Sequence, residues 1–93
     1  MHYVYILRCS DGSYYVGRTD DLHARLEAHN AGRASAWTAR RRPATLLYQE
    51  TCPDEKSAMA RESQVKHWTR AKKEALIAGN RNLLRRLSKA KPT

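Results

Sequence analysis

Two short runs of aromatic and β-branched residues open the chain, and a polar turn separates them. The runs are centred on residues 3–7 and 14–16, and Ser10, Asp11 and Gly12 lie between them. This pattern predicts a β-hairpin. A three-residue loop is favoured over a two-residue loop, because Gly12 suits the left-handed last position of such a loop.

The length of this loop decides which side chains share a face, because side chains alternate along a strand. With three residues in the loop, Tyr5 lies opposite Gly17 and Leu7 lies opposite Tyr15. Tyr5 and Tyr15 then project from one face, and Gly17 leaves space beside Tyr5. A two-residue loop would place the two tyrosines on opposite faces. In an arbitrary hairpin, packing in the core is the commoner role for two such rings.

A helix of about three turns is expected between the capping residues 19–21 and the stop at Gly32. Arg25 and His29 share its inward face, an arrangement that suits an anion bound between them. Alternatively, Arg25 pairs with Asp21 and His29 is a solvated residue at the helix end. The inward stripe, at spacing i, i+3, i+4 and i+7, consists of Leu22, Arg25, Leu26 and His29.

Residues 33–43 show no periodicity and contain no acidic residue, which predicts a basic loop closed by Pro43. Trp37 lies within this loop and could stack on a nucleic-acid base or anchor the loop to the core. We expect the arginines of the loop to contact nucleic acid. They are Arg33, Arg40, Arg41 and Arg42.

A third strand is expected over residues 44–51, and residues 53–55 then open a second helix. Glu62 lies on or beside the buried stripe of this helix. A carboxylate there is costly unless it is paired or binds a metal ion. Lys66, four residues later, is the ordinary helical partner that would satisfy it. The expected apolar positions are Ala58, Met59, Val65 and Trp68.

The remaining sequence predicts a helix from Thr69 to Gly79 and a short final helix over residues 80–87. The elements together predict an α+β fold in the order β-β-α-β-α-α, with a small three-stranded sheet flanked by helices. We expect one domain over residues 1–88, followed by a basic tail at residues 89–93.

The charge of the chain indicates an anionic partner. Its 93 residues include 18 Lys and Arg against 9 Asp and Glu, a net charge of +9. Nucleic acid is the first expectation and an anionic membrane the second. Cys9 and Cys52 are too few for a disulfide scaffold and are expected to be small buried residues. The chain has no apolar run long enough to span a membrane and begins with strand-like sequence in place of a signal peptide, so we expect a cytoplasmic protein. We also expect it to be a monomer.

Taken in order, these residues resemble the GIY-YIG nuclease domain, in particular its small stand-alone subfamily. Tyr3-Val4-Tyr5 and Tyr15-Val16-Gly17 resemble the two triplets that name the family. Arg25 and His29 follow on the first helix and Glu62 on the second. The resemblance extends from about residue 2 to residue 79. The triplets are variants that keep the tyrosines and the glycine.

The resemblance implies a divalent-metal-dependent endonuclease that hydrolyses DNA phosphodiester bonds at a single site on the sheet face, with structured, nicked or single-stranded DNA as candidate substrates. Glu62 would hold one Mg²⁺ or Mn²⁺ ion, and no small-molecule cofactor is expected. Arg25 would contact the scissile phosphate. Tyr5 would orient or deprotonate the attacking water. Tyr15 and His29 would hydrogen-bond the phosphate, the water or Tyr5. Gly17 would provide space.

Other residues are expected to bind nucleic acid outside this catalytic set. Arg18 projects from the opposite strand parity and is expected to contact the phosphate. The full set is Arg18, Arg33, Trp37, Arg40, Arg41, Arg42, Lys66 and Lys73.

One departure of this sequence from the family pattern favours an alternative function. Better-known nucleases of the superfamily carry an asparagine about three helical turns after the metal glutamate, and Glu74 occupies that place here. The alternative is a basic nucleic-acid-binding module with weak or no catalysis. In both cases, binding should be largely non-specific and strongly dependent on salt.

Overall fold

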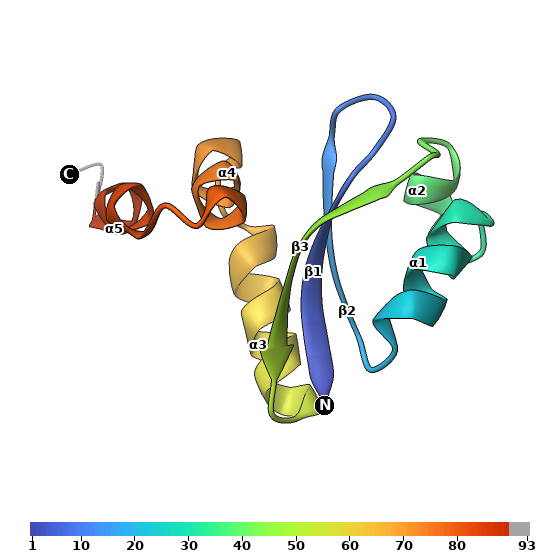
Figure 1. Cartoon of the computed structure of the whole chain (residues 1–93), viewed down its shortest axis with the longest axis horizontal. Helices are drawn as coiled ribbons and strands as arrows, with labels where there is room; N and C mark the ends of the chain where they lie inside the picture. The colour runs from blue at the N-terminus through green and yellow to red at the C-terminus, as the bar shows by residue number, and fades with distance from the viewer. Residues whose placement is uncertain (90–93) are drawn as a thin grey trace.

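The centre of the protein is a three-stranded antiparallel sheet with strand order β2-β1-β3 (Figure 1). The computed structural model describes residues 1–89, with side chains to residue 88. The expected basic tail, apart from the backbone of Lys89, lies outside the described residues. The strands are β1 (His2–Arg8), β2 (Tyr14–Thr19) and β3 (Thr45–Cys52).

The hairpin between β1 and β2 has the predicted three-residue loop. The backbone N–H of Cys9 donates to the carbonyl of Ser13 at 2.9 Å, and Gly12 has a φ of +84°. Tyr5 pairs with Gly17, and Leu7 pairs with Tyr15. The predicted register is therefore confirmed, and Tyr5 and Tyr15 lie on the same face of the sheet.

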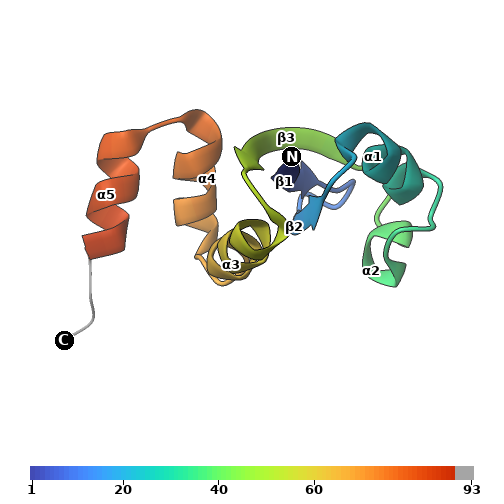
Figure 2. The same ribbon diagram turned by 90° about the horizontal axis from the view of Figure 1, so that it is seen from below.

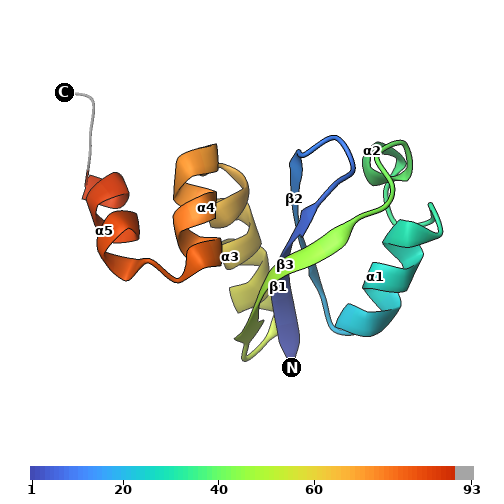
Figure 3. The same ribbon diagram turned by 45° about the horizontal axis from the view of Figure 1, so that its top comes forward.

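Helices cover both faces of the sheet (Figures 2 and 3). Helices α1 and α2 lie on one side, α3 and α4 lie on the other, and α5 lies farthest from the sheet in every view. The helices are α1 (Leu22–Asn30), α2 (Ala36–Ala39), α3 (Glu55–Lys66), α4 (Arg70–Ala78) and α5 (Arg81–Lys89).

Side-chain caps define where these helices begin. Asp21 accepts a hydrogen bond from the backbone N–H of Ala24, and Asp54 accepts one from Ser57. Thr69 caps α4 in the same way, and Gly79 ends it in the left-handed conformation, as predicted. All these caps follow from short polar side chains placed directly before the helices.

The segment expected to be an irregular basic loop contains a short helix, α2. Ser35 caps it by accepting hydrogen bonds from the backbone N–H groups of Trp37 and Thr38. Four residues are too few to produce a hydrophobic period, so the sequence pattern could not reveal this helix. The prediction of a structureless loop was wrong at this point.

The two faces of the sheet carry separate apolar clusters, because alternate side chains of β1 point to opposite sides. Val4 and Ile6 pack with Val16, Ala58 and Val65 beneath α3. The other cluster faces α1 and contains Tyr5, Leu7, Ala44, Tyr15, Leu22, Leu26 and Leu46.

Most of the predicted fold is confirmed by this architecture. The α+β class, the sheet and the order of the long elements agree with the prediction, and Cys9 and Cys52 are buried. Met59, one of the apolar positions expected on the buried stripe of α3, is 50% exposed. None of the helices in the described part of the chain has the length and apolar character needed to cross a bilayer.

Candidate active site

A polar pocket of about 240 Å³ lies at the outer edge of β2. Tyr5 and Tyr15 reach it from the face of the sheet covered by α1, whereas Glu62 reaches it from α3 on the opposite face. The pocket therefore wraps around the edge strand, which corrects the expectation of a site on one sheet face. Its lining residues are Tyr5, Tyr15, Gly17, Arg18, Arg25 and Glu62.

Gly17 allows the Tyr5 side chain to reach this edge. A Cβ atom at position 17 would overlap the hydroxyl and ring of Tyr5 and would lie 3.0 Å from Cε1 of Tyr15. The two tyrosine rings have centroids 6.4 Å apart. The predicted space beside Tyr5 is thus present, and only glycine provides it.

The Tyr5 hydroxyl belongs to a buried chain of hydrogen bonds. It lies 2.9 Å from Nε2 of His29, whose Nδ1 lies 2.9 Å from the hydroxyl of Thr38. The Thr38 hydroxyl donates to the carbonyl of Ser35 at 3.2 Å. Since that donation uses its hydrogen, Thr38 must accept from Nδ1–H of His29. Nε2 then carries no proton and accepts the hydrogen bond from Tyr5.

Burial adjusts the acidity of both rings in this chain. Burial raises the pKa of Tyr5 well above its usual value, Tyr15 and Glu62 add to this, and Arg25 opposes it. Burial, assisted by Arg25, lowers the pKa of His29. At neutral pH the Tyr5–His29 pair is therefore a neutral phenol donating to a neutral imidazole. His29 is only 1% exposed, so it is not the solvated helix-end residue that was the alternative.

Arg25 lies on the exposed surface of α1 and lines the pocket opposite Glu62. The prediction that Arg25 points inward from the helix was wrong, because its side chain is exposed. The alternative pairing with Asp21 is not present among the ion pairs of the described residues. Its guanidinium is thus available beside the pocket.

Glu62 pairs with Arg18, a partner that the sequence did not suggest. Nε of Arg18 lies 3.3 Å from the Glu62 carboxylate and its Nη1 lies 3.6 Å from that of Glu55. The side chain of Glu62 is 24% exposed. Over residues 1–88, no ion pair joins Glu62 to Lys66. Arg18 has the strand parity that was expected: like Val16, it points to the face of the sheet covered by α3, which carries both glutamates.

The donor chemistry of the pocket fits a hydrated magnesium ion. No cluster of three or more His, Cys, Asp or Glu side chains suited to a metal occurs among the described residues. Mg²⁺, however, keeps most of its water ligands and is often held by one or two carboxylates. Glu62 supplies a hard oxygen donor facing the pocket. Arg18 competes for the same carboxylate.

The residues expected to bind nucleic acid lie in several separate parts of the structure. Arg41 pairs with Asp11 at 3.1 Å, and its guanidinium carbon lies 4.0 Å from the centroid of a Trp37 ring. Arg42 donates to the carbonyl of Ala39, while Arg33 and Arg40 are exposed. Lys66 and Lys73 do not line the polar pocket; they line a neighbouring one together with Tyr14, Tyr15, Val16 and Trp37.

Sequence reasoning missed two residues around the site. Thr38 is fully buried against His29, and no periodic signal pointed to it. Tyr14 lies beside the neighbouring pocket and donates to Glu74 at 2.9 Å. Glu74, which stands where other superfamily members are expected to carry asparagine, also pairs with Arg70 at 3.3 Å.

Comparison with known proteins finds relatives among the UPF0213 proteins. A UPF0213 protein from Bacillus pumilus is 46% identical over 76 residues, covering 82% of this chain and 78% of that protein. A UPF0213 protein from Staphylococcus aureus is 47% identical over 76 residues, covering 82% and 93%. The solution NMR structure of a Bacillus halodurans UPF0213 protein superposes with a TM-score of 0.54 at 43% identity, covering 83% and 82%.

The family assignment rests on the segment that builds the pocket. The GIY-YIG catalytic domain matches residues 1–75, from the first strand into α4. That range includes both tyrosines, the two arginines and the glutamate that line the pocket. With its edge-strand pocket and its UPF0213 relatives, this chain belongs to the GIY-YIG family.

Proposed function

We propose that this protein is a divalent-metal-dependent endonuclease that hydrolyses phosphodiester bonds in DNA. The observation that carries the proposal is the pocket at the edge of β2, which combines a carboxylate, two guanidinium groups and two phenols. These groups match the needs of phosphodiester hydrolysis: a counter-charge for the phosphate, a positioned water and help for the leaving oxygen.

The phosphate would be bound by Arg25, whose planar guanidinium can donate two hydrogen bonds to its oxygens. Arg25 approaches from α1 and Glu62 from α3, so a phosphate between them would lie beside the Tyr5 hydroxyl. Tyr15 lines the same pocket, and its hydroxyl could donate to a phosphate oxygen or to water.

Tyr5 would accept a proton from the attacking water while passing its own proton to His29, so it need not be ionised before the reaction. Its hydroxyl donates to Nε2 of His29, which leaves the phenol oxygen free to accept a proton from water. As that proton arrives, the phenol proton would move to Nε2. The hydrogen bond from His29 Nδ1–H to Thr38 would hold the imidazole in the required tautomer.

A Mg²⁺ or Mn²⁺ ion would be held by Glu62, with water completing its coordination. Once bound, such an ion supplies Lewis acidity and lowers the pKa of a coordinated water. Binding would require the Arg18 guanidinium to give up its contact with Glu62, and Arg18 could then contact the phosphate.

The test is a DNA-cleavage assay with Mg²⁺ and with EDTA. We expect Glu62→Gln and Tyr5→Phe to lower the rate by about a hundredfold or more, in the range found when a group that stabilises the transition state is removed. Glu55→Gln is the matched control, because Glu55 also contacts Arg18 but lies outside the pocket. Cleavage that persists in EDTA and in both variants would contradict the proposal.

A second candidate is a nucleic-acid-binding module with negligible turnover. It is favoured by Glu74, which takes the place of the superfamily asparagine. Glu74 accepts a hydrogen bond from Tyr14 and forms an ion pair with Arg70. This candidate predicts salt-sensitive DNA binding that Glu62→Gln leaves unchanged, and no product at high protein concentration.

A further inference from the structure

A second pocket, of about 380 Å³, adjoins the polar one along β2. Tyr15 lines both pockets, so a ligand in one lies next to a ligand in the other. The walls of the second pocket are aromatic and aliphatic, and two lysines reach over it. We call it the strand-edge groove; it is lined by Tyr14, Tyr15, Val16, Trp37, Lys66 and Lys73.

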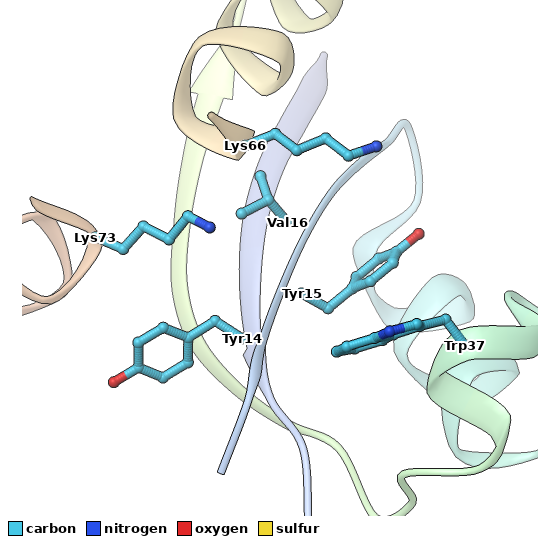
Figure 4. A pocket seen from close by; sticks show the side chains of 6 residues that line it. All are labelled: Tyr14, Tyr15, Val16, Trp37, Lys66 and Lys73. Atoms are coloured by element: carbon cyan, nitrogen blue, oxygen red, sulfur yellow. The ribbon is translucent and has the colours of Figure 1, made fainter. Parts of the chain in front are cut away.

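The side chains of the groove come from both layers of the protein (Figure 4). Lys66 and Lys73 extend toward β2 from α3 and α4, with Val16 between them. Tyr15 and Trp37 lie together on the other side of the strand, their ring centroids 6.0 Å apart and their planes inclined by 28°. The groove thus has an apolar floor and a cationic rim.

The two lysines are free to meet an anion. Among the ion pairs of residues 1–88, neither lysine has a carboxylate partner. Lys73 is half-buried, and its burial together with the neighbouring Arg70 lowers the pKa of its ammonium. A phosphate beside Lys73 would offset this unfavourable environment. Trp37, although a large apolar side chain, is 37% exposed at this place.

We propose that the strand-edge groove binds an unpaired nucleotide next to the scissile phosphate, its base against Tyr15 and Trp37 and its phosphates on Lys66 and Lys73. The inference rests on the proposed nuclease function and specifies its substrate. A base stacked within a duplex cannot enter a pocket of this kind, whereas an unpaired base can. The substrate is therefore DNA with a single-stranded segment at the cleavage point.

Binding in EDTA tests this inference without cleavage. The chain has two tryptophans, so Trp68→Phe leaves Trp37 as the fluorescent reporter of the groove. We expect a single-stranded oligonucleotide, or a duplex with one unpaired nucleotide, to quench Trp37 and to bind about tenfold more tightly than the matched duplex. General electrostatics alone would favour the duplex, which has the higher charge density. A stable abasic analogue at the unpaired position should abolish the quenching.

Charge-matched variants separate the groove from the net charge. Lys66→Ala/Lys73→Ala should weaken binding about tenfold more than Lys56→Ala/Arg85→Ala, which removes two cations from exposed positions outside the groove. Equal losses in the two double variants, or equal affinity for duplex and single strand, would overturn the inference. Quenching of Trp37 by oligoglutamate but not by oligonucleotide would overturn it in favour of an acidic protein partner.

The experiments distinguish failure of the groove proposal from failure of the proposed nuclease function. Preferential binding of unpaired DNA with no cleavage under any metal condition would support the groove and contradict the nuclease. Metal-dependent cleavage with no preference for an unpaired nucleotide would support the nuclease and overturn the groove.

Discussion

The hydroxyl of Tyr5 donates a buried 2.9 Å hydrogen bond to Nε2 of His29, joining the first strand to the end of the first helix. Each residue lies within a conspicuous sequence pattern, but their contact depends on Gly17, which lets the phenol pass the edge of β2. The direction of the bond is set by Thr38, which accepts from the opposite nitrogen of the imidazole. Thr38, which is two hydrogen bonds away from Tyr5, thus determines which nitrogen of His29 carries the proton.

Thr38→Val tests the last link of this chain. The substitution keeps the shape of the side chain but removes the acceptor of His29 Nδ1–H, leaving a buried donor unsatisfied. We expect the free energy of unfolding to fall by about 1–3 kcal/mol, measured by urea denaturation. Thr38→Ser keeps the hydroxyl and should recover most of the loss.

Nitrogen NMR of the His29 ring gives a second measurement for the same variants. In the wild type, Nδ1 should carry the proton and Nε2 should not. Thr38→Val should increase the population of the other tautomer and lower cleavage, whereas a purely structural role for Thr38 would lower stability and leave the tautomer unchanged.

His29 should make the protein less stable in mild acid. Its pKa is lowered on folding, so its contribution to stability is present above the unfolded value of about 6.5 and is lost as the pH falls through the lower folded value. We expect the thermal midpoint to fall as the pH is lowered from 7 to 5. The carboxyl pKa values of Asp11 and Asp54 are also lowered, so these groups titrate below this window.

The control for this pH dependence is His29→Gln, which has lower stability but no ionisable ring. Its thermal midpoint should change less between pH 7 and pH 5 than that of the wild type. Equal slopes for both proteins would show that another group is responsible.

Gly17→Ala should damage the site more than the fold. The new Cβ would overlap the Tyr5 hydroxyl and ring and crowd Tyr15, so the phenol must move away from His29. We expect a loss of about 1–3 kcal/mol in stability, as for other overpacked positions, together with loss of cleavage.

Gly12→Ala is the companion variant. Nothing lies within 4 Å of the Cβ that it would add, but its φ of +84° strains any L side chain. It should cost about 1 kcal/mol in stability and leave cleavage intact. Loss of cleavage in both variants to the same degree would mean that stability, and not the space at Gly17, is what matters.

The parts of the fold that follow from local rules were predictable from the sequence. Gly12 and the length of its loop set the register of the hairpin, and single capping residues such as Asp21, Asp54 and Thr69 set the helix starts. The α2 helix was missed because a helix of four residues has no period, and its cap, Ser35, is common in loops as well.

The site was predictable as a set of residues but not as a set of contacts. The order of Tyr5, Arg25 and Glu62 pointed to one pocket, and they do line one. The partner of Glu62 could not be found, because Arg18 belongs to another element and the sequence does not show that α3 packs on the face of the sheet to which Arg18 points. Nearest-neighbour rules favour Lys66 because they consider only one helix.

Arg18→Gln should strengthen metal binding at Glu62. Arg18 holds the Glu62 carboxylate at 3.3 Å and adds a positive charge where a divalent cation would bind. Its side chain is one-third exposed, so the ion pair is worth about 1 kcal/mol or less. We therefore expect the Kd for Mn²⁺, measured by water-proton relaxation, to fall about two- to fivefold. Glu62→Gln should abolish the binding, and unchanged affinity in Arg18→Gln would show that the guanidinium does not compete with the ion.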